Sequence, residues 1–282
     1  MYTNKKDVAL LVHACDRYEF LFKGFDYFFS KYWNINVDCN YYFATEEKKV
    51  SINGFTNIQS GKGEWADRLS YLLKEKISEK YVLYFQEDMW INKETNPLFF
   101  NELFEFAFKN KCQQIKLHSS EVYKTNRTEN YLQGFNIATL DNQNSDFLMS
   151  HQVTLWDRSF LIKQLKKNEH PWRNERKGTK RLKKLKPEIF HIDYFAENGN
   201  KEININSNPQ NRSEYQTISI NSTLNDNILP FIDILQKEGG LEECEYGTKL
   251  YNNYTNKLTH DGLEKPRKVD IIKRFKNWIL AK

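Results

Sequence analysis

The stretch KYVLYFQEDMW, residues 80–90, constrains the fold of this chain more than any other part of its sequence. Tyr81 to Phe85 is an unbroken apolar run that is short enough for a strand buried on both faces, as in parallel sheets. The run stops at Gln86, Glu87 and Asp88. In open α/β sheets, ligands bind beyond the carboxyl ends of the strands. The acidic pair therefore predicts a site for a cation held on a phosphate, with two solvated acids at an ordinary strand end as the alternative.

The rest of the chain alternates between strand-like and helix-like patterns. Strands are predicted at 7–15, 37–44, 81–85, 113–118, 147–156 and 186–194, and helices at 19–33, 64–78, 98–108 and 158–167. This alternation predicts βαβ units, and hence an α/β fold with a mainly parallel sheet flanked by helices. We expect a catalytic domain over residues 1–200, an irregular Asn/Ser-rich region packed on it over 201–264, and a C-terminal helical extension over 265–282.

Charge is concentrated in two segments of a chain whose net charge is only +5. Residues 265–282 hold seven basic residues and one acid, and residues 173–186 hold eight Lys and Arg against the single Glu175. A protein that wraps nucleic acid more often shows a broad basic face, so no nucleic acid partner is expected. For residues 173–186, a solvated helix face and a contact for an acidic acceptor are the alternatives to a role at a phosphate.

The sequence contains no apolar run near the roughly 20 residues that span a bilayer, and its N-terminus does not resemble a signal peptide. We expect a cytoplasmic protein. The segment 265–282 has the composition of a basic amphipathic helix with one Trp, which would suit the inner face of an anionic membrane; a helix docked on the domain is the alternative. The four cysteines form no CxxC pair, so we expect neither a zinc site nor disulfides.

Residues 8–194 resemble the GT-A fold glycosyltransferases, the nucleotide-sugar transferases of bacterial capsule and lipopolysaccharide synthesis. The features that carry the resemblance are the β/α N-terminal half, the strand ending in the acidic pair, a QxxxW strand from Gln152 to Trp156 with a helix after it, and a Glu-containing turn beyond that helix. The resemblance implies that His13, Asp16 and Arg17 hold the nucleobase and ribose. It also implies that Glu87 and Asp88 hold a divalent cation, Mn²⁺ or Mg²⁺, on the donor diphosphate.

This chain reads Gln86-Glu87-Asp88 where the family pattern is DxD, so metal-dependent and metal-independent chemistry both stay open. Some relatives in this fold neutralise the diphosphate with basic side chains, which here would be Arg173, Arg176 and Lys177. The alternating pattern of a strand would place His191 and Asp193 on one face, so that His191 could complete a metal site with the acidic pair.

An inverting transfer needs a base that removes the proton from the acceptor hydroxyl. Glu169 and Glu175 lie on either side of Trp172, in the turn where the resemblance places such a base. We favour Glu175; for both, a surface glutamate paired with a neighbouring Arg is the alternative. The further candidates for contact with the donor or acceptor sugar are Glu64, Trp65, Asp67, Gln152 and Trp172.

The sequence thus predicts a glycosyltransferase that moves a sugar from a nucleotide-diphosphate donor, UDP by default, to a hydroxyl of a glycan or polyprenyl-linked acceptor in bacterial surface polysaccharide synthesis. A non-catalytic protein that binds nucleic acid or an anionic surface through the basic segments is the alternative from another class. A sugar nucleotidyltransferase is less favoured, because HACDRYE after the first strand contains no glycine for a phosphate loop.

Overall fold

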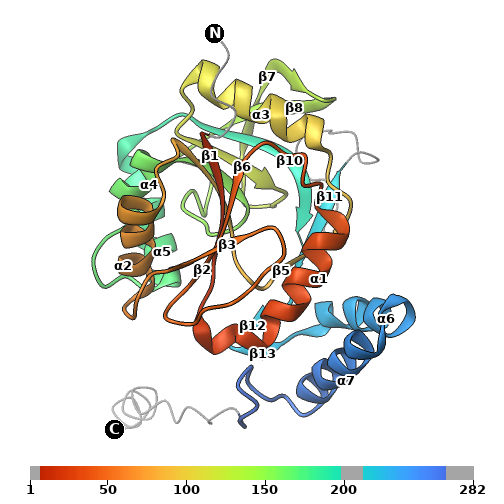
Figure 1. The fold of residues 1–282 in the computed structure, drawn as a ribbon. Helices are drawn as coiled ribbons and strands as arrows, with labels where there is room; N and C mark the ends of the chain where they lie inside the picture. The colour runs from red at the N-terminus through yellow and green to blue at the C-terminus, as the bar shows by residue number, and fades with distance from the viewer. Residues whose placement is uncertain (1–6, 198–211, 265–282) are drawn as a thin grey trace, which may run out of the picture. The chain divides into compact units, whose positions relative to one another are not determined.

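The computed structural model describes residues 7–197 and 212–264. The chain divides into two compact units, residues 1–218 and residues 219–282. The larger unit contains the sheet and its helices, and the smaller one contains a helical pair (Figure 1). The C-terminal segment 265–282, for which the sequence predicts a basic amphipathic helix, lies outside the described residues.

The N-terminal half of the large unit forms four parallel strands in the order β3-β2-β1-β4. Their bounds are β1 (Val8–His13), β2 (Asn40–Thr45), β3 (Thr56–Gln59) and β4 (Tyr81–Phe85). Every residue of β1 and β4 is buried, because helices cover both faces of the sheet. The prediction of an α/β fold with a mainly parallel sheet flanked by helices is confirmed.

The sheet continues past β4 as β9-β6-β10-β11-β5, and the β7–β8 hairpin is joined to β10. The bounds are β5 (Met89–Lys93), β6 (Gln114–His118), β7 (Thr125–Leu132), β8 (Phe135–Leu140), β9 (Thr154–Asp157), β10 (Ile189–Glu197) and β11 (Ser213–Thr217). β9 is antiparallel to both of its neighbours. The polar stretch 126–144 contains most of the β7–β8 hairpin, in which Phe135, Ile137 and Leu140 are buried.

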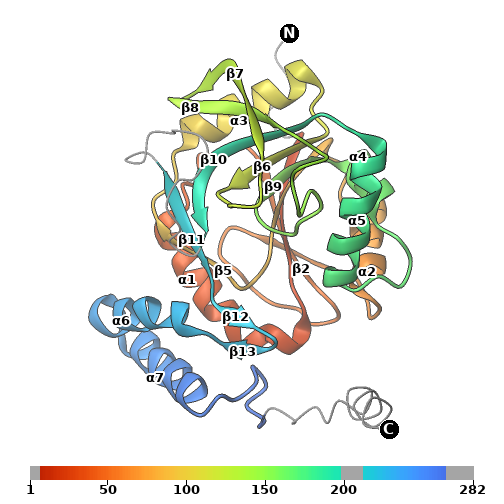
Figure 2. The same ribbon diagram turned by 180° about the vertical axis from the view of Figure 1, so that it is seen from behind.

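Two groups of helices cover the two faces of the sheet (Figures 1 and 2). On one face lie η1 (Asp16–Leu21), α1 (Phe22–Tyr32) and α3 (Pro97–Asn110), whose rings pack together with those of β2, β4 and β10. On the other lie α2 (Trp65–Tyr71) with its π-helical continuation η2 (Leu72–Lys76), α4 (Arg158–Gln164) and α5 (Pro171–Leu185). The sequence pattern predicted α1, α2, α3 and α4 but not α5, because lysines and arginines dominate that helix.

The smaller unit corrects the expectation that residues 201–264 are irregular. It contains the short pair β12 (Ser219–Ile220) and β13 (Thr223–Leu224), then η4 (Asp226–Ile228), α6 (Leu229–Glu238) and α7 (Leu241–Thr255). Ile228, Phe231, Ile232 and Leu235 recur at helical spacing and are buried, and Gly247 of α7 is buried opposite Leu235 of α6. The Asn/Ser-rich composition of the stretch before these helices led to the prediction of an irregular region.

All four cysteines carry free thiols. None of the helices described is long and apolar enough to cross a membrane.

Candidate active site

The order of the strands marks one position on the sheet as a ligand site. β2 and β3 lie on one side of β1, whereas β4 lies on the other. The direction in which successive strands are added to the sheet therefore reverses between β1 and β4. In open α/β sheets, ligands bind outside the carboxyl ends of the strands at such a switch point. The segments that begin at Ala14 and at Gln86 both leave the sheet at this position.

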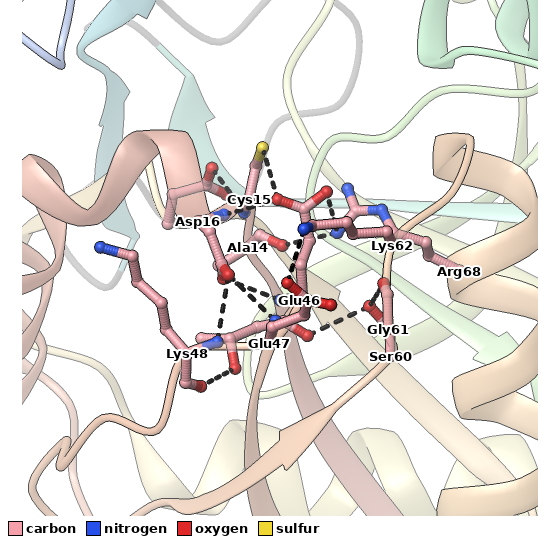
Figure 3. Close-up of polar contacts among 12 residues, drawn as sticks. Ala14, Cys15, Asp16, Glu46, Glu47, Lys48, Ser60, Gly61, Lys62 and Arg68 are labelled. Atoms are coloured by element: carbon pink, nitrogen blue, oxygen red, sulfur yellow. Dashed lines mark hydrogen bonds and ion pairs between the residues drawn. The ribbon is translucent and has the colours of Figure 1, made fainter.

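The loop after β1 is tied to the loop after β2 by Asp16. Its Oδ1 accepts the backbone N–H of Glu46 at 2.8 Å, and its Oδ2 accepts those of Glu47 at 2.9 Å and Lys48 at 3.0 Å (Figure 3). Through these three hydrogen bonds, the Asp16 carboxylate holds the two loops together. These bonds argue against the predicted role of Asp16 in binding nucleobase or ribose. Arg17 is exposed, and its guanidinium lies 5.6 Å from the ring centroid of Tyr18.

A buried ion pair that the sequence analysis missed lies behind this loop. Arg68 of α2 donates from Nη1 to the Ala14 carbonyl at 3.1 Å and lies 3.6 Å from Oε1 of Glu46 (Figure 3). Glu46 Oε2 in turn accepts the Asp16 N–H at 3.0 Å and the Cys15 thiol at 3.3 Å. Burial raises the pKa of Cys15 to about 11, so this thiol is not a nucleophile at neutral pH.

Glu87 and Asp88 follow β4 directly and lie against the end of β1. Glu87 is 4% exposed, and its Oε1 accepts the backbone N–H of Cys15 at 3.3 Å. Burial first, and then repulsion by Asp88, raises the pKa of Glu87, and burial also raises the pKa of the half-buried Asp88. Two adjacent carboxyl groups whose charged forms are destabilised in this way would be stabilised by a bound cation.

The described residues contain no group of three or more His, Cys, Asp or Glu side chains able to hold a metal ion. The predicted set of Glu87, Asp88 and His191 is therefore not assembled. His191 lies on β10, and β9 and β6 lie between that strand and β4. Its Nε2 is bonded to the His118 carbonyl at 2.8 Å instead.

A layer of buried aromatic and imidazole rings lies on the α2 side of the switch point. The ring of Trp65 is 5.7 Å from that of His13 and 4.1 Å from that of His151, and the ring of Tyr84 is 6.4 Å from that of His13. Both ring nitrogens of His13 and Nε2 of His151 have no hydrogen-bond partner among the described residues. Buried polar atoms are normally paired, so these nitrogens point to a ligand or water at this position.

Both histidines of this layer are neutral at physiological pH. Burial, with smaller contributions from Arg68 and His151, holds the pKa of His13 well below its usual value. Burial likewise lowers the pKa of His151 to about 3. Each neutral ring has one nitrogen that accepts and one that donates a hydrogen bond, which suits the polar atoms of an uncharged ligand group.

Glu175 of α5 is held beside this layer by the loop that carries His151. Its Oε1 accepts the backbone N–H of His151 at 3.1 Å, and the residue is half-buried. Burial raises the pKa of Glu175, while the hydrogen bond from the His151 N–H and, to a smaller extent, the charge of Lys116 oppose the shift. The fully buried Lys116 anchors the same loop by donating to the Phe147 carbonyl at 3.0 Å and to Ser150 Oγ at 2.8 Å. Glu175 thus meets the requirements for a general base: it is fixed, and its pKa is raised.

Glu169 has a different environment. Its carboxylate accepts hydrogen bonds from Arg181 Nη1 at 3.1 Å, from Arg181 Nη2 at 3.0 Å and from Asn174 Nδ2 at 2.7 Å. Burial alone would raise the pKa of Glu169, but these hydrogen bonds outweigh it and hold the pKa below its usual value. A carboxylate in a bidentate ion pair is a structural tie between the turn and α5, which corrects its candidacy as the base.

The other candidates take different positions. Gln152 Oε1 accepts the Tyr215 hydroxyl at 2.7 Å, and Asp67 Oδ2 accepts the Asn168 N–H at 3.0 Å, so both have structural partners. Glu64 is exposed at the N-cap of α2. The side chain of Trp172 is exposed, and so are those of Arg173, Arg176 and Lys177, all on α5.

Sequence reasoning missed Arg68, Glu46, Tyr84 and His151. Arg68 did carry a signal, because it lies three residues after Trp65 on the buried stripe of an amphipathic helix, where an Arg needs a partner. His151 carried none, since its loop and its contact with Trp65 depend on the tertiary structure.

No model of a known protein family matches the sequence. No curated protein matches it either. Among solved structures, the chain is similar to residues 1–349 of S. aureus TarS, with a TM-score of 0.45 and 10% identity over 88% of this chain and 70% of that one. For the same TarS fragment in complex with UDP, the TM-score is 0.46 and the identity 11%, over 89% of this chain and 71% of that one. For its complex with UDP-GlcNAc, the TM-score is 0.45 and the identity 11%, over 88% of this chain and 71% of that one.

Proposed function

We propose that this protein is a glycosyltransferase that uses a nucleotide-diphosphate sugar, with UDP as the expected nucleotide. The observation that carries the proposal is the acidic pair at the switch point of the sheet, where Glu87 contacts the end of β1 through Cys15. Enzymes with open α/β sheets bind their ligands at this position. The unpaired imidazole nitrogens beside it support a site that receives a polar ligand.

A divalent cation fits this site as a ligand shared with the donor. Mg²⁺ and Mn²⁺ accept hard oxygen ligands, and Mg²⁺ is often held by one or two carboxylates together with substrate phosphates. Glu87 and Asp88 would supply the carboxylates. When bound, the cation would neutralise the charge that develops on the departing nucleoside diphosphate. In a metal-independent reaction, the buried Arg68, whose charge lowers the pKa of Glu87, is a fixed positive group that could take this role.

Glu175 would act as the base. It would take the proton from the acceptor hydroxyl as that oxygen bonds to the anomeric carbon and the bond from that carbon to the diphosphate oxygen breaks. The proton then resides on Glu175, and the nucleoside diphosphate leaves with the electron pair. A single displacement of this kind inverts the anomeric configuration. A glycan or polyprenyl-linked acceptor, a role in bacterial surface polysaccharide synthesis and a cytoplasmic location complete the proposal and rest on the resemblance.

Nucleotide binding tests the proposal directly. We expect UDP with Mn²⁺ at about 100 times its Kd to stabilise the protein by about 2.7 kcal/mol, which corresponds to a rise in Tm of roughly 5 to 10 °C. GDP and CMP serve as comparison nucleotides. Asp88→Asn should abolish the manganese-dependent part of the shift. Asp38→Asn, at the opposite end of β2, is the matched control and should keep it. No response to any nucleotide, or an equal response in both variants, would contradict the proposal.

A further inference from the structure

The outer surface of α5 carries a concentration of positive charge that the proposed site does not use. Residues 163–186 contain eleven Lys and Arg against two acids, Glu169 and Glu175, in a chain whose net charge is +5. Glu169 is bound by Arg181, and Glu175 faces the loop of His151. Neither acid neutralises the outer side of the helix.

Five basic side chains form one line along this helix. Its buried side consists of Asn174, Gly178 and Leu182, so the register of α5 against the core is fixed. The exposed basic residues follow each other at helical spacing, over about 16 Å at 1.5 Å per residue. We call them the basic stripe: Arg173, Arg176, Lys177, Lys180 and Lys184.

Acidic side chains neutralise little of the charge on the basic stripe within the described residues, although the charge of Lys177 contributes to lowering the pKa of Glu169. None of its five side chains forms an ion pair within residues 7–197 and 212–264; the neighbouring Arg181 and Lys183 are paired with Glu169 and Asp146. Like charges at i, i+3 and i, i+4 destabilise a helix by roughly 0.2 to 0.5 kcal/mol per pair. An anionic ligand along the stripe would remove this repulsion.

The stripe begins at the end of α5 that carries the candidate base. Trp172, which is 63% exposed, precedes Arg173 in the first turn of α5, and Glu175 follows two residues later on the opposite, inner side of the helix. An indole ring offers a flat apolar surface for the C–H face of a sugar, and a row of cations offers partners for repeated negative charges. A chain bound along the stripe and over Trp172 would therefore reach the end of α5 from which Glu175 points inward.

We propose that the basic stripe and Trp172 bind a linear anionic glycan, a polymer with carboxylate or phosphate groups along its length, as the acceptor. This inference rests on the proposed function and specifies its acceptor class. A membrane is disfavoured, because the apolar face of α5 is packed into the core and cannot enter a bilayer interface. Single-stranded nucleic acid is disfavoured as well, since its binding sites stack successive bases on several aromatic side chains, whereas Trp172 is the one aromatic residue of α5.

Binding to a labelled anionic glycan, polygalacturonate, tests the inference without any need for turnover. Fluorescence anisotropy compares the wild-type full chain with Arg176→Gln/Lys177→Gln/Lys180→Gln, which keeps helix propensity nearly unchanged. The matched control is Lys109→Gln/Lys111→Gln/Lys124→Gln, which removes the same charge from exposed positions of the same unit. Neutral dextran, a single-stranded RNA and vesicles with anionic lipid serve as comparison ligands.

We expect the stripe variant to bind polygalacturonate about tenfold more weakly, the control variant to bind like wild type, and the wild-type affinity to fall as salt screens the charges. Trp172→Ala should weaken binding and leave the salt dependence unchanged. An equal loss in both triple variants, or tighter stripe-dependent binding of RNA or vesicles than of the glycan, would overturn the inference. Stabilisation by UDP is measured in parallel for the wild type and the same variants. A wild type that UDP does not stabilise would contradict the proposed function, whereas the result for glycan binding would still stand.

Discussion

Two glutamates six residues apart show how environment assigns roles to identical side chains. Glu169 accepts three hydrogen bonds, two of them from one guanidinium, and its pKa is lowered. Glu175 accepts one backbone hydrogen bond, and burial raises its pKa. A general base must give up its hydrogen-bond partners at a small cost in free energy, and its pKa must be high enough for it to accept a proton. Only Glu175 satisfies both conditions.

We expect Glu175→Gln to lower kcat by about 10² to 10⁴-fold, because the amide cannot accept the proton of the acceptor hydroxyl. UDP stabilisation should be unchanged. In the wild type, the rate should fall as pH drops through the raised pKa of Glu175, since the protonated acid is inactive as a base. Glu188→Gln, an exposed glutamate just after α5, is the control. A fully active Glu175→Gln variant would exclude this residue as the base.

At the scale of elements, the position of α5 against the loop 147–151 determines where Glu175 lies. Met149 donates its N–H to Thr179 Oγ1 at 3.2 Å, and Gln114 Nε2 donates to the Leu148 carbonyl at 2.9 Å, so the loop is bonded both to the helix and to β6. Gly178 permits this approach. A Cβ on Gly178 would lie 2.6 Å from Cγ of Met149 and 2.8 Å from its Cβ.

A double-mutant cycle tests this packing. Gly178→Ala should lower the free energy of unfolding by about 1 to 2 kcal/mol, because the clash with Met149 exceeds the gain of up to about 1 kcal/mol in helix propensity. In a Met149→Ala background, which removes the clashing atoms beyond Cβ, the same change should cost less or stabilise the protein. Urea denaturation gives the free energy of unfolding of the wild type, the two single variants and the double variant. Additive effects would mean that Gly178 and Met149 are not coupled.

At the scale of the molecule, buried histidines are distributed along the α2 and α5 side of the sheet. His13, His118, His151 and His191 are each at most 5% exposed, and burial lowers the pKa of each. A histidine whose pKa is lower in the folded than in the unfolded state stabilises the fold above the unfolded value near 6.5. That stability is lost as pH falls toward the folded value. Glu87 and Asp88 have raised pKa values, so their contribution to the free energy of unfolding increases as pH falls.

The pH dependence of His191 can be isolated by substitution. Burial lowers its pKa to about 4, so between pH 7 and pH 5 it should account for a loss of about 2 kcal/mol in the free energy of unfolding. In His191→Gln the amide can still donate to the His118 carbonyl but does not titrate. Urea denaturation at both pH values should show a smaller loss for the variant by that amount. Equal losses in the two proteins would show that His191 does not contribute.

Local pattern was enough to predict much of the fold. The apolar run Tyr81 to Phe85 is short enough for a strand covered on both sides, and its abrupt end places Glu87 and Asp88 directly after that strand. The spacing of apolar residues likewise predicted α1 to α4. The pattern failed where polar composition dominates, in the β7–β8 hairpin and in α6 and α7, because there a few apolar residues suffice to bury one side.

The sequence by itself determined the α/β class and the residues that follow each buried strand, because periodicity and burial are local properties of the chain. Only the tertiary structure decided which of those residues meet. It paired Glu169 with Arg181, separated His191 from the acidic pair by two intervening strands, and brought Arg68 and His151 to the switch point. These outcomes depend on strand order and helix register, which are set by contacts between distant parts of the chain.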